Sequence, residues 1–408
     1  MAFKKFTADN IFTGIAMLGA GNVLLTDETG AIEGIVSKEE AGDDVEYHPG
    51  ILSPGFINCH CHLELSHMKG LIPEKTGLVD FVITVMQQRG FSEDVIYAAI
   101  EQAEEEMMSN GIVAVGDICN TAHTIPQKQK GNLHYYNFIE ATGFVPAFAQ
   151  KRFEQAEGVY SQFVNRETSI VNNGRASLQS AIHDSRFTCI VPHAPYSTSA
   201  ALMQLINNHS AGKVISIHNQ ETKDENSFFL TGESGFIKLF NLFSIDISFF
   251  QPSGKTSLQT YLPELDKAGR LILVHNTFTS EEDMLFVKNN QWANPPLGNG
   301  SLIWCLCPNA NLYIENTLPN VDMLRNNGCN IVLGTDSLAS NNTLCILGEV
   351  KTLRSNFPHI PLEEMLQWAT YNGAKALEME SELGSFEKGK TPGVLSFNAN
   401  LDELKRLI

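Results

Sequence analysis

The chain has 408 residues, of which 43% are hydrophobic and 18% are charged, so it can bury a large core and lacks the composition typical of disorder. Its formal net charge of −18 repels phosphate groups, which argues against nucleic acid and anionic membranes as partners and favours a small molecule. No run of about 18 apolar residues occurs, and no apolar stretch follows the N-terminal lysines, so we expect a cytoplasmic protein. The eight cysteines form no CxxC pair, which is typical of reduced thiols.

The first segment of the chain predicts a small sheet. Within residues 1–53, the short apolar runs NVLLT and IEGIV flank the turn signal DETG, which indicates antiparallel strands. Near the C-terminus, GSFEKGKTPGVLSFN predicts a turn and a strand that return to this sheet. We therefore expect a small, discontinuous β-sandwich domain formed by residues 1–53 and 386–408.

Residues 54–385 alternate between short apolar runs and amphipathic helical segments. This texture is typical of repeated β-α units with a parallel sheet, in the α/β class. Eight such units predict a (β/α)8 TIM-type barrel, in which functional groups lie at the C-terminal ends of the strands. The eight runs are GFINCH, IVAVGDIC, HYYNFIEATG, TCIVPHAP, VISIHN, LILVHN, LIWCLCPN and NIVLGTDS.

Several segments after these runs carry signals for helix starts. Ser92 suits an N-cap, with acidic residues following in the first turn. Ser280 and Asp283 have the spacing of a capping box. Pro361 suits the first turn of a long helix over residues 362–379.

The first run ends in a pair of histidines, His60 and His62. Side chains alternate along a strand, so these two rings point the same way at a spacing that suits one metal ion, while Cys59 and Cys61 face the other side. A pair with this spacing also occurs among hydrogen-bonded core histidines, so its meaning depends on the residues that end the other runs.

Polar residues end four other runs: His193 the fourth, His218 the fifth, His275 the sixth and Asp336 the eighth. Together, the histidine pair, His218 and Asp336 offer three nitrogens and one oxygen. Such a set suits one divalent metal ion, with zinc as first choice and iron as second, and leaves a coordination position for water.

A proton must then move, and three residues are candidates for moving it. Glu221 follows His218 by three positions and can act as general acid/base without binding the metal. His275 can polarise the leaving group or stabilise an oxyanion, and Asp336 can take a proton from the attacking water. Taken singly, a glutamate of this kind is more often simply solvated.

An insertion after the fifth run, from Glu221 to about Tyr261, is rich in phenylalanine. It can wall a pocket on the catalytic face, or form a hydrophobic cluster that touches no ligand. Its phenylalanines are Phe228, Phe229, Phe236, Phe240, Phe243, Phe249 and Phe250.

These stretches resemble the amidohydrolase superfamily, in particular its one-metal branch that contains cytosine deaminases and chlorohydrolases. The similarity spans nearly the whole chain and rests on PGFINCHCH, PHAPYSTS, HNQE, LVHN, CPNANLYI, GTDS and TYNGAKAL. It implies the same four metal ligands and the catalytic residues Glu221 and His275, with His193 contacting substrate. It also implies hydrolytic deamination, in which a metal-bound hydroxide attacks and Glu221 shuttles the proton. Cys61 and Ala310 depart from the usual threonine and serine.

A finer similarity concerns the stretches HCHLELS and VDFV, which resemble those of aminofutalosine deaminases. It implies that the substrate is 6-amino-6-deoxyfutalosine, an intermediate of menaquinone biosynthesis, and that Glu64 and Asp80 bind its sugar. The substrate carries a carboxylate, for which Arg152 or Lys151 could supply a cation.

Other readings stay open at this point. The same ligands serve deaminases or chlorohydrolases of other heterocycles, such as adenosine, guanine, cytosine or a triazine. A catalytically inactive barrel that serves as a scaffold is a remote alternative, because such proteins usually lose metal ligands. A homo-oligomer is compatible with the sequence.

Overall fold

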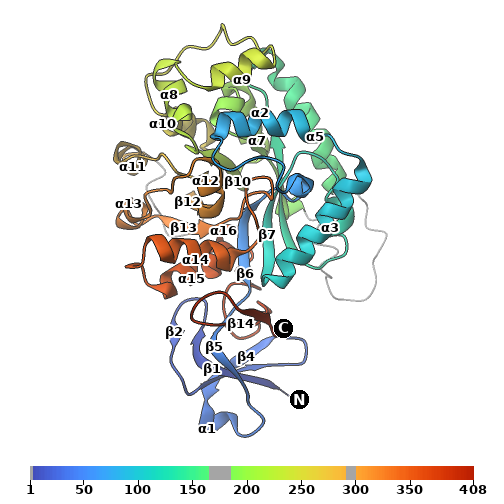
Figure 1. Ribbon diagram of the computed structural model, residues 1–408, viewed down its shortest axis with the longest axis vertical. Helices are drawn as coiled ribbons and strands as arrows, with labels where there is room; N and C mark the ends of the chain where they lie inside the picture. Colours follow the sequence, from blue (N-terminus) through green and yellow to red (C-terminus); the bar gives the residue numbers. More distant parts are fainter. Residues whose placement is uncertain (1–2, 165–184, 291–299) are drawn as a thin grey trace.

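The structure is a computed structural model that describes residues 3–164, 185–290 and 300–408 (Figure 1). A large α/β domain forms one end of the molecule, and a small sheet that contains both chain ends forms the other. No helix in these ranges is both long and apolar enough to span a membrane.

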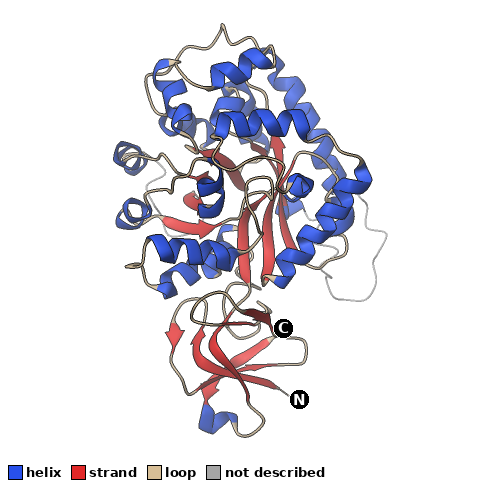
Figure 2. Ribbon diagram, viewed as in Figure 1, coloured by secondary structure: helices blue, strands red, loops and turns tan. Residues whose placement is uncertain are grey.

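Eight parallel strands form the centre of the large domain, and helices surround them (Figure 2). Every strand falls on one of the eight predicted runs. The strands are β6 (Phe56–Cys61), β7 (Ile112–Cys119), β8 (His134–Ala141), β9 (Thr188–Pro192), β10 (Val214–Asn219), β11 (Arg270–His275), β12 (Ser301–Leu306) and β13 (Asn330–Leu333).

The strands pair in chain order within two four-stranded sheets, β6 to β9 and β10 to β13. Backbone hydrogen bonds join the two sheets at both seams. At one seam, His218 donates its N–H to the carbonyl of His193 at 3.0 Å; at the other, Asp336 donates to the carbonyl of His60 at 3.0 Å. The predicted (β/α)8 TIM-type architecture is confirmed, and these seam contacts involve residues of the predicted site.

Helices cover the outside of the strands and the rim at their C-terminal ends. Those on the outside are α3 (Glu93–Ser109), α4 (Ile125–Lys128), α5 (Ala149–Val164), α7 (Ala200–His209), α11 (Glu281–Lys288), α13 (Val321–Asn326), α14 (Ile346–Asn356), α15 (Leu362–Ala369) and α16 (Tyr371–Ala376). Those near the rim are α2 (Leu78–Gln88), α8 (Lys223–Thr231), α9 (Phe236–Leu242), α10 (Ser257–Tyr261) and α12 (Pro308–Ile314). Short 3-10 helices include η1 (Leu63–Met68) and η4 (Pro195–Ser197).

The helix-start signals agree with the structure, but one predicted helix is divided. Ser92 is the N-cap of α3, and Ser280 and Asp283 form the capping box of α11. The predicted helix over residues 362–379 breaks at Thr370 into α15 and α16. The break lets Gly373 approach β6 closely, since a Cβ there would lie 2.7 Å from Cβ of Ile57.

The small domain consists of one seven-stranded sheet with the order β15-β14-β5-β1-β3-β4, in which β2 pairs with β1. The C-terminal segment returns to this sheet, because β14 pairs antiparallel with β5. One pairing differs from the expected antiparallel pattern: β1 and β5 are parallel, since a long connection separates them. The strands are β1 (Lys4–Phe12), β2 (Met17–Leu18), β3 (Asn22–Thr26), β4 (Ile32–Ser37), β5 (Glu46–Ser53), β14 (Leu395–Phe397) and β15 (Leu404–Arg406), with α1 (Lys38–Ala41) after β4.

A buried ion pair fixes the chain where it leaves β6. Lys128 of α4 is fully buried, and its Nζ lies 2.5 Å from Oδ2 of Asp117 on β7. Lys128 also donates to Oδ1 of Asn137 at 2.8 Å. The other oxygen of Asp117 accepts the backbone N–H of Leu63 at 2.9 Å, directly after His62. The pair therefore holds the segment that carries the second histidine of the predicted site.

Replacing Lys128 by methionine should destabilise the protein by about 3–5 kcal/mol, because the Asp117 carboxylate would stay buried without its partner. The matched control is Lys130→Met, which removes a pair with Glu101 whose side chains are 46% and 51% exposed. That change should cost no more than about 1 kcal/mol. Urea unfolding of both variants checks the expectation, and equal, small shifts in the midpoint would contradict it.

Candidate metal centre and active site

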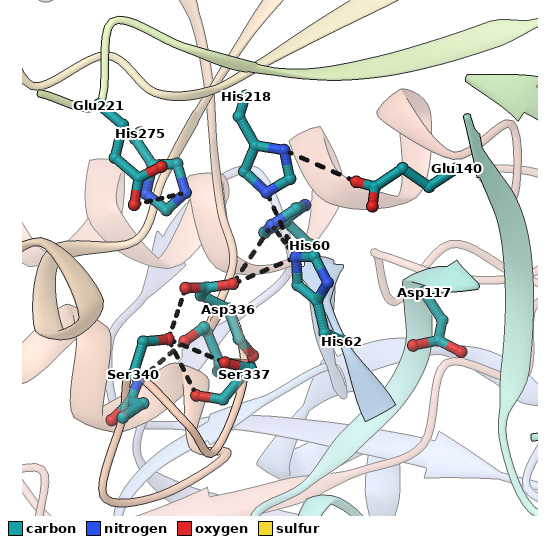
Figure 3. Close-up of polar contacts among 12 residues, drawn as sticks. His60, His62, Asp117, Glu140, His218, Glu221, His275, Asp336, Ser337 and Ser340 are labelled. Atoms are coloured by element: carbon teal, nitrogen blue, oxygen red, sulfur yellow. Dashed lines mark hydrogen bonds and ion pairs between the residues drawn. The ribbon is translucent and has the colours of Figure 1, made fainter. Parts of the chain in front are cut away.

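Four side chains from three strand ends converge at one point of the barrel (Figure 3). The predicted ligands His60, His62, His218 and Asp336 are buried, and one ligand atom of each lies within 4.8 Å of all the others. Nε2 of His62 lies 3.2 Å from Nε2 of His60 and 3.3 Å from Nε2 of His218. Oδ1 of Asp336 lies 3.5 and 3.4 Å from Nε2 of His60 and His62.

This donor set fits a divalent metal ion. His218 donates its Nδ1–H to the carbonyl of His193 at 2.7 Å, so its Nε2 carries a lone pair toward the other ligands. Burial lowers the pKa of His62 to about 3 and that of His218 well below its usual range, so both rings are neutral. Three imidazoles and a carboxylate are a ligand set that zinc accepts.

The carboxylate of Asp336 is oriented by its own loop. Its Oδ2 accepts a hydrogen bond of 2.5 Å from the hydroxyl of Ser340, which directs Oδ1 toward the histidines. Burial acts to raise the pKa of Asp336, but His60, His62 and His275 outweigh it and hold the pKa well below its usual range. Asp336 has a φ of 58°, and His275 has a φ of 75°. Such conformations are strained in residues other than glycine and are found at functional sites.

Glu221 and His275 form a second pair beside the metal ligands. Nε2 of His275 lies 3.6 Å from Oε1 of Glu221. Nδ1 of His275 lies 3.3 Å from Oδ1 of Asn311, an acceptor, so Nδ1 carries the hydrogen and Nε2 the lone pair. Burial, with a smaller effect from Asp336, raises the pKa of Glu221 well above its usual range. Burial lowers the pKa of His275 to about 4. Glu221 can therefore hold a proton next to a neutral imidazole.

A cavity of about 750 Å³ opens over these groups. Its polar end contains the predicted site residues His62, His218, Glu221, His275 and Asp336. Its apolar wall comes from α2, the loop after β8, and α9 with the loop that follows it. The residues of this wall are Leu78, Phe81, Val82, Val85, Met86, Phe144, Val145, Ala147, Phe148, Leu239, Phe240 and Ile245.

Two of the three predicted substrate-binding residues line this cavity. His193 does so, with its Nδ1 2.6 Å from the hydroxyl of Ser197. Glu64 also does so, and its Oε2 accepts both the N–H and the O–H of Thr121, at 3.0 and 2.9 Å.

Asp80 does not reach the cavity, which corrects the expectation from the sequence. Its side chain is 52% exposed and pairs with Lys238 of α9. The face of α2 that lines the cavity carries apolar residues at helical spacing, and Asp80 lies off that face. Spacing along the chain does not show which face of a helix turns toward a site.

The phenylalanine-rich insertion does both things that the sequence allowed. Phe240 lines the cavity. Phe228 stacks on Phe250 with ring centroids 4.2 Å apart, and with Phe236 it belongs to a buried cluster behind the wall. The insertion therefore supplies the wall residues Leu239, Phe240 and Ile245 and a hydrophobic support for them.

The polar residues of the cavity that sequence reasoning missed include Arg89, Asn120 and Glu140. Glu140 lies near the end of β8, so the same strand-end rule that found the histidines could have found it. Arg89 follows α2 on the face that lines the cavity, a position that needs the helix orientation. Of the two cations suggested for a substrate carboxylate, Arg152 lines the cavity and Lys151 is not among its lining residues.

Glu140, His193 and His218 are also close enough together to hold an ion. The nitrogen of His218 on this side is Nδ1, which already donates its hydrogen to the carbonyl of His193. It has no lone pair to offer there, so this second grouping does not fit a metal.

Comparison with known proteins identifies the family. The amidohydrolase family matches residues 51–406. The chain belongs to this family. A 5-methylthioadenosine/S-adenosylhomocysteine deaminase of Teredinibacter turnerae is 27% identical over 368 residues, which cover 86% of this chain and 73% of that protein. Together, the family and such deaminase relatives make this amidohydrolase a hydrolase of C–N bonds.

Solved structures share the fold of this amidohydrolase. The aminofutalosine deaminase of Helicobacter pylori, in complex with methylthio-coformycin, superimposes with a TM-score of 0.78 at 20% identity, covering 99% of this chain and 97% of that one. An adenosine deaminase of Xanthomonas campestris with bound zinc gives a TM-score of 0.66 at 18% identity, covering 96% and 83%.

We expect one divalent metal ion per chain. His62→Ala should lose this ion, because Nε2 of His62 lies within 3.3 Å of Nε2 of both His60 and His218. The matched control is Cys61→Ala, which changes a buried neighbour that is not part of the ligand set. Elemental analysis of the purified proteins measures both. Full metal content in His62→Ala would contradict the site, as would an unaltered protein that takes up neither zinc, iron nor manganese.

Proposed function

We propose that this amidohydrolase is a zinc-dependent aminohydrolase that deaminates an aminopurine nucleoside, with 6-amino-6-deoxyfutalosine as its best substrate. The observation that carries the proposal is the cavity itself. It combines the metal ligands and an acid–imidazole pair with a long apolar wall and two arginines. The deaminase relatives and the fold shared with an aminofutalosine deaminase support this choice.

In this proposal, His60, His62, His218 and Asp336 hold the metal. When bound, it supplies a water molecule whose pKa is lowered toward about 7, so that a nucleophile is available near neutral pH. The overall reaction forms a bond from the water oxygen to the ring carbon and breaks the carbon–nitrogen bond, releasing ammonia.

Glu221 and His275 handle the protons of this reaction. The raised pKa of Glu221 lets its carboxyl hold a proton, which it delivers to the departing amine. Nε2 of His275 has a lone pair toward Glu221 and can accept a hydrogen bond from it or from the substrate. Asp336 accepts a proton from the attacking water, as expected from the sequence.

The size and lining of the cavity favour a nucleoside with an extension over a free base. A cavity of about 750 Å³ lies well inside the range of sites for drug-sized ligands, whereas a cytosine or triazine ring would leave most of it unfilled. A flat purine with a large apolar substituent can cover the wall formed by α2 and α9. Enzymes that act on the free bases and triazines named as alternatives share the four metal ligands. Those smaller substrates would leave this wall uncovered.

The arginines favour an anionic group on the substrate. Arg89 and Arg152 line the cavity of a protein whose formal net charge is −18. Cations on the lining of a cavity in so acidic a protein can attract and orient a carboxylate. The carboxylate of 6-amino-6-deoxyfutalosine provides such a group, and adenosine does not.

Glu221→Gln should keep the metal and lose turnover by at least about 10²-fold, because an amide cannot carry the proton. His275→Gln is the companion variant, and its loss should combine with that of Glu221→Gln in a less than additive way, since the two groups act on one proton path. Metal analysis and steady-state kinetics measure both. Near-normal turnover, or a metal-free Glu221→Gln protein, would show that Glu221 has another role.

The substrate assignment predicts that 6-amino-6-deoxyfutalosine is deaminated with a higher kcat/KM than adenosine, guanine or cytosine. Arg152→Gln should raise KM for this substrate and change adenosine little, because only the former carries the carboxylate. Ammonia release across the set measures the ranking. If a free base or a triazine is the best substrate, the nucleoside assignment fails while the metal-dependent hydrolase stands.

A further inference from the structure

The two groups of the proposed proton path come from different strands. Glu221 follows β10, and His275 ends β11; Nε2 of His275 lies 3.6 Å from Oε1 of Glu221 (Figure 3). This distance is longer than a hydrogen bond, so the pair does not hold itself together. The backbone segments that carry the two residues must therefore set their separation.

Gln220 stands directly before Glu221 and has a strained backbone. Its φ is 46°, in the left-handed region that residues with a side chain rarely adopt. Such a conformation persists only where surrounding contacts hold it. The N–H of Gln220 donates to Oε1 of Glu225 at 2.9 Å, and its carbonyl accepts the N–H of Phe278 at 2.9 Å. The second contact joins the turn before Glu221 to the loop after His275.

The side chain of Gln220 makes the same link again. Gln220 is fully buried, and its Nε2 donates to Oδ2 of Asp283 at 2.8 Å and to Oδ1 of Asn226 at 3.0 Å. Its Oε1 accepts the hydroxyl of Thr279 at 2.7 Å. Thr279 lies shortly after His275, and Asp283 belongs to the capping box of α11. A buried amide whose donors and acceptor all have partners is a rigid connection.

The sheet does not require this connection. β10 and β11 pair in register up to Asn219 and His275. Gln220 lies one residue beyond that ladder, so its contacts order the residue that follows the strand and not the strand itself. That residue is Glu221.

We propose that Gln220 is a positioning residue for the proton transfer, because it ties the turn that carries Glu221 to the loop after His275. The inference rests on the proposed function, in which the carboxyl and the imidazole share a proton path. Gln220 is not among the residues that line the cavity, so it acts through Glu221. A catalytic group displaced by about 1 Å can slow a reaction about 10²-fold, which sets the scale of the expected effect.

The test compares Gln220→Ala with the unaltered zinc-loaded enzyme on 6-amino-6-deoxyfutalosine and adenosine. We expect kcat to fall about 10- to 100-fold and KM to change by no more than about threefold, because Glu221 moves while the cavity keeps its lining. Zinc content, measured by elemental analysis, should stay unchanged. In the Glu221→Gln background the same substitution should lower kcat by about threefold or less, since the group that Gln220 positions is already gone.

Gln259→Ala is the matched control. The amide of Gln259 donates to the other oxygen of the same aspartate, Oδ1 of Asp283, at 3.1 Å, but Gln259 lies on α10 and not in the turn before Glu221. Its loss should leave kcat nearly unchanged. If Gln220→Ala does not fold, Gln220→Gly provides the test, because glycine adopts a φ of 46° without strain and still lacks the side-chain link. Thermal unfolding of each variant measures its stability.

Several results would overturn the inference and leave the proposed function standing. A full loss of kcat in the Glu221→Gln background, or a loss of zinc, would show that Gln220 acts on the fold or on the metal ligands. An unchanged kcat, with or without a rise in KM, would show that Gln220 does not place Glu221. Equal losses in Gln220→Ala and Gln259→Ala would assign the effect to Asp283 alone. An unaltered enzyme that deaminates neither nucleoside would overturn the proposed function, and this inference with it.

Discussion

The convergence of three imidazole nitrogens and one carboxylate oxygen within 4.8 Å is the constraint on which the rest of the structure depends. Ring nitrogens that direct lone pairs toward one another gain little from that arrangement unless a cation lies between them. The barrel enforces the arrangement through its seams. The same backbone groups that join β9 to β10 and β13 to β6 belong to His193, His218, His60 and Asp336. The residues that close the barrel are therefore, in part, the residues that hold the metal ligands in place.

The metal site could be predicted from the sequence because it follows from the alternation of side chains along a strand and from the position of residues at strand ends. Alternation in a strand places His60 and His62 on one side, and the barrel rule places strand-end residues on one face. Neither inference requires knowledge of which face of a helix turns toward the site. Where that knowledge was needed, prediction from sequence was wrong: Asp80 was expected in the site but pairs with Lys238 at the surface. The predicted long helix over residues 362–379 likewise failed because close packing against β6 requires a break at Thr370.

Glu140 and Arg89 show a different limit. Glu140 ends a strand as clearly as His218 does, but a glutamate gives no signal of its own in a sequence with 46 acidic residues. What distinguishes it is a buried oxygen that accepts no hydrogen bond from the residues that the structure describes, a property of packing and not of residue type. Arg89 stands out only once α2 is seen to line the cavity. Burial and direction, which are set by long-range contacts, are the information that the sequence pattern does not contain.

The cavity divides into two parts that the chain builds in different ways. The end that contains the metal ligands, Glu221 and His275 is carried by β6, β10, β11 and the loop after β13. Short strands and strained residues such as His275 fix the positions of these side chains. The opposite wall stands on α2, α9 and connecting loops, elements inserted between strands and supported by the phenylalanine cluster around Phe228. Insertions of this kind can change without disturbing the seams that hold the ligands. Substrate choice in this amidohydrolase should therefore vary with α2 and α9, while the metal set and the Glu221–His275 pair stay constrained by the barrel itself.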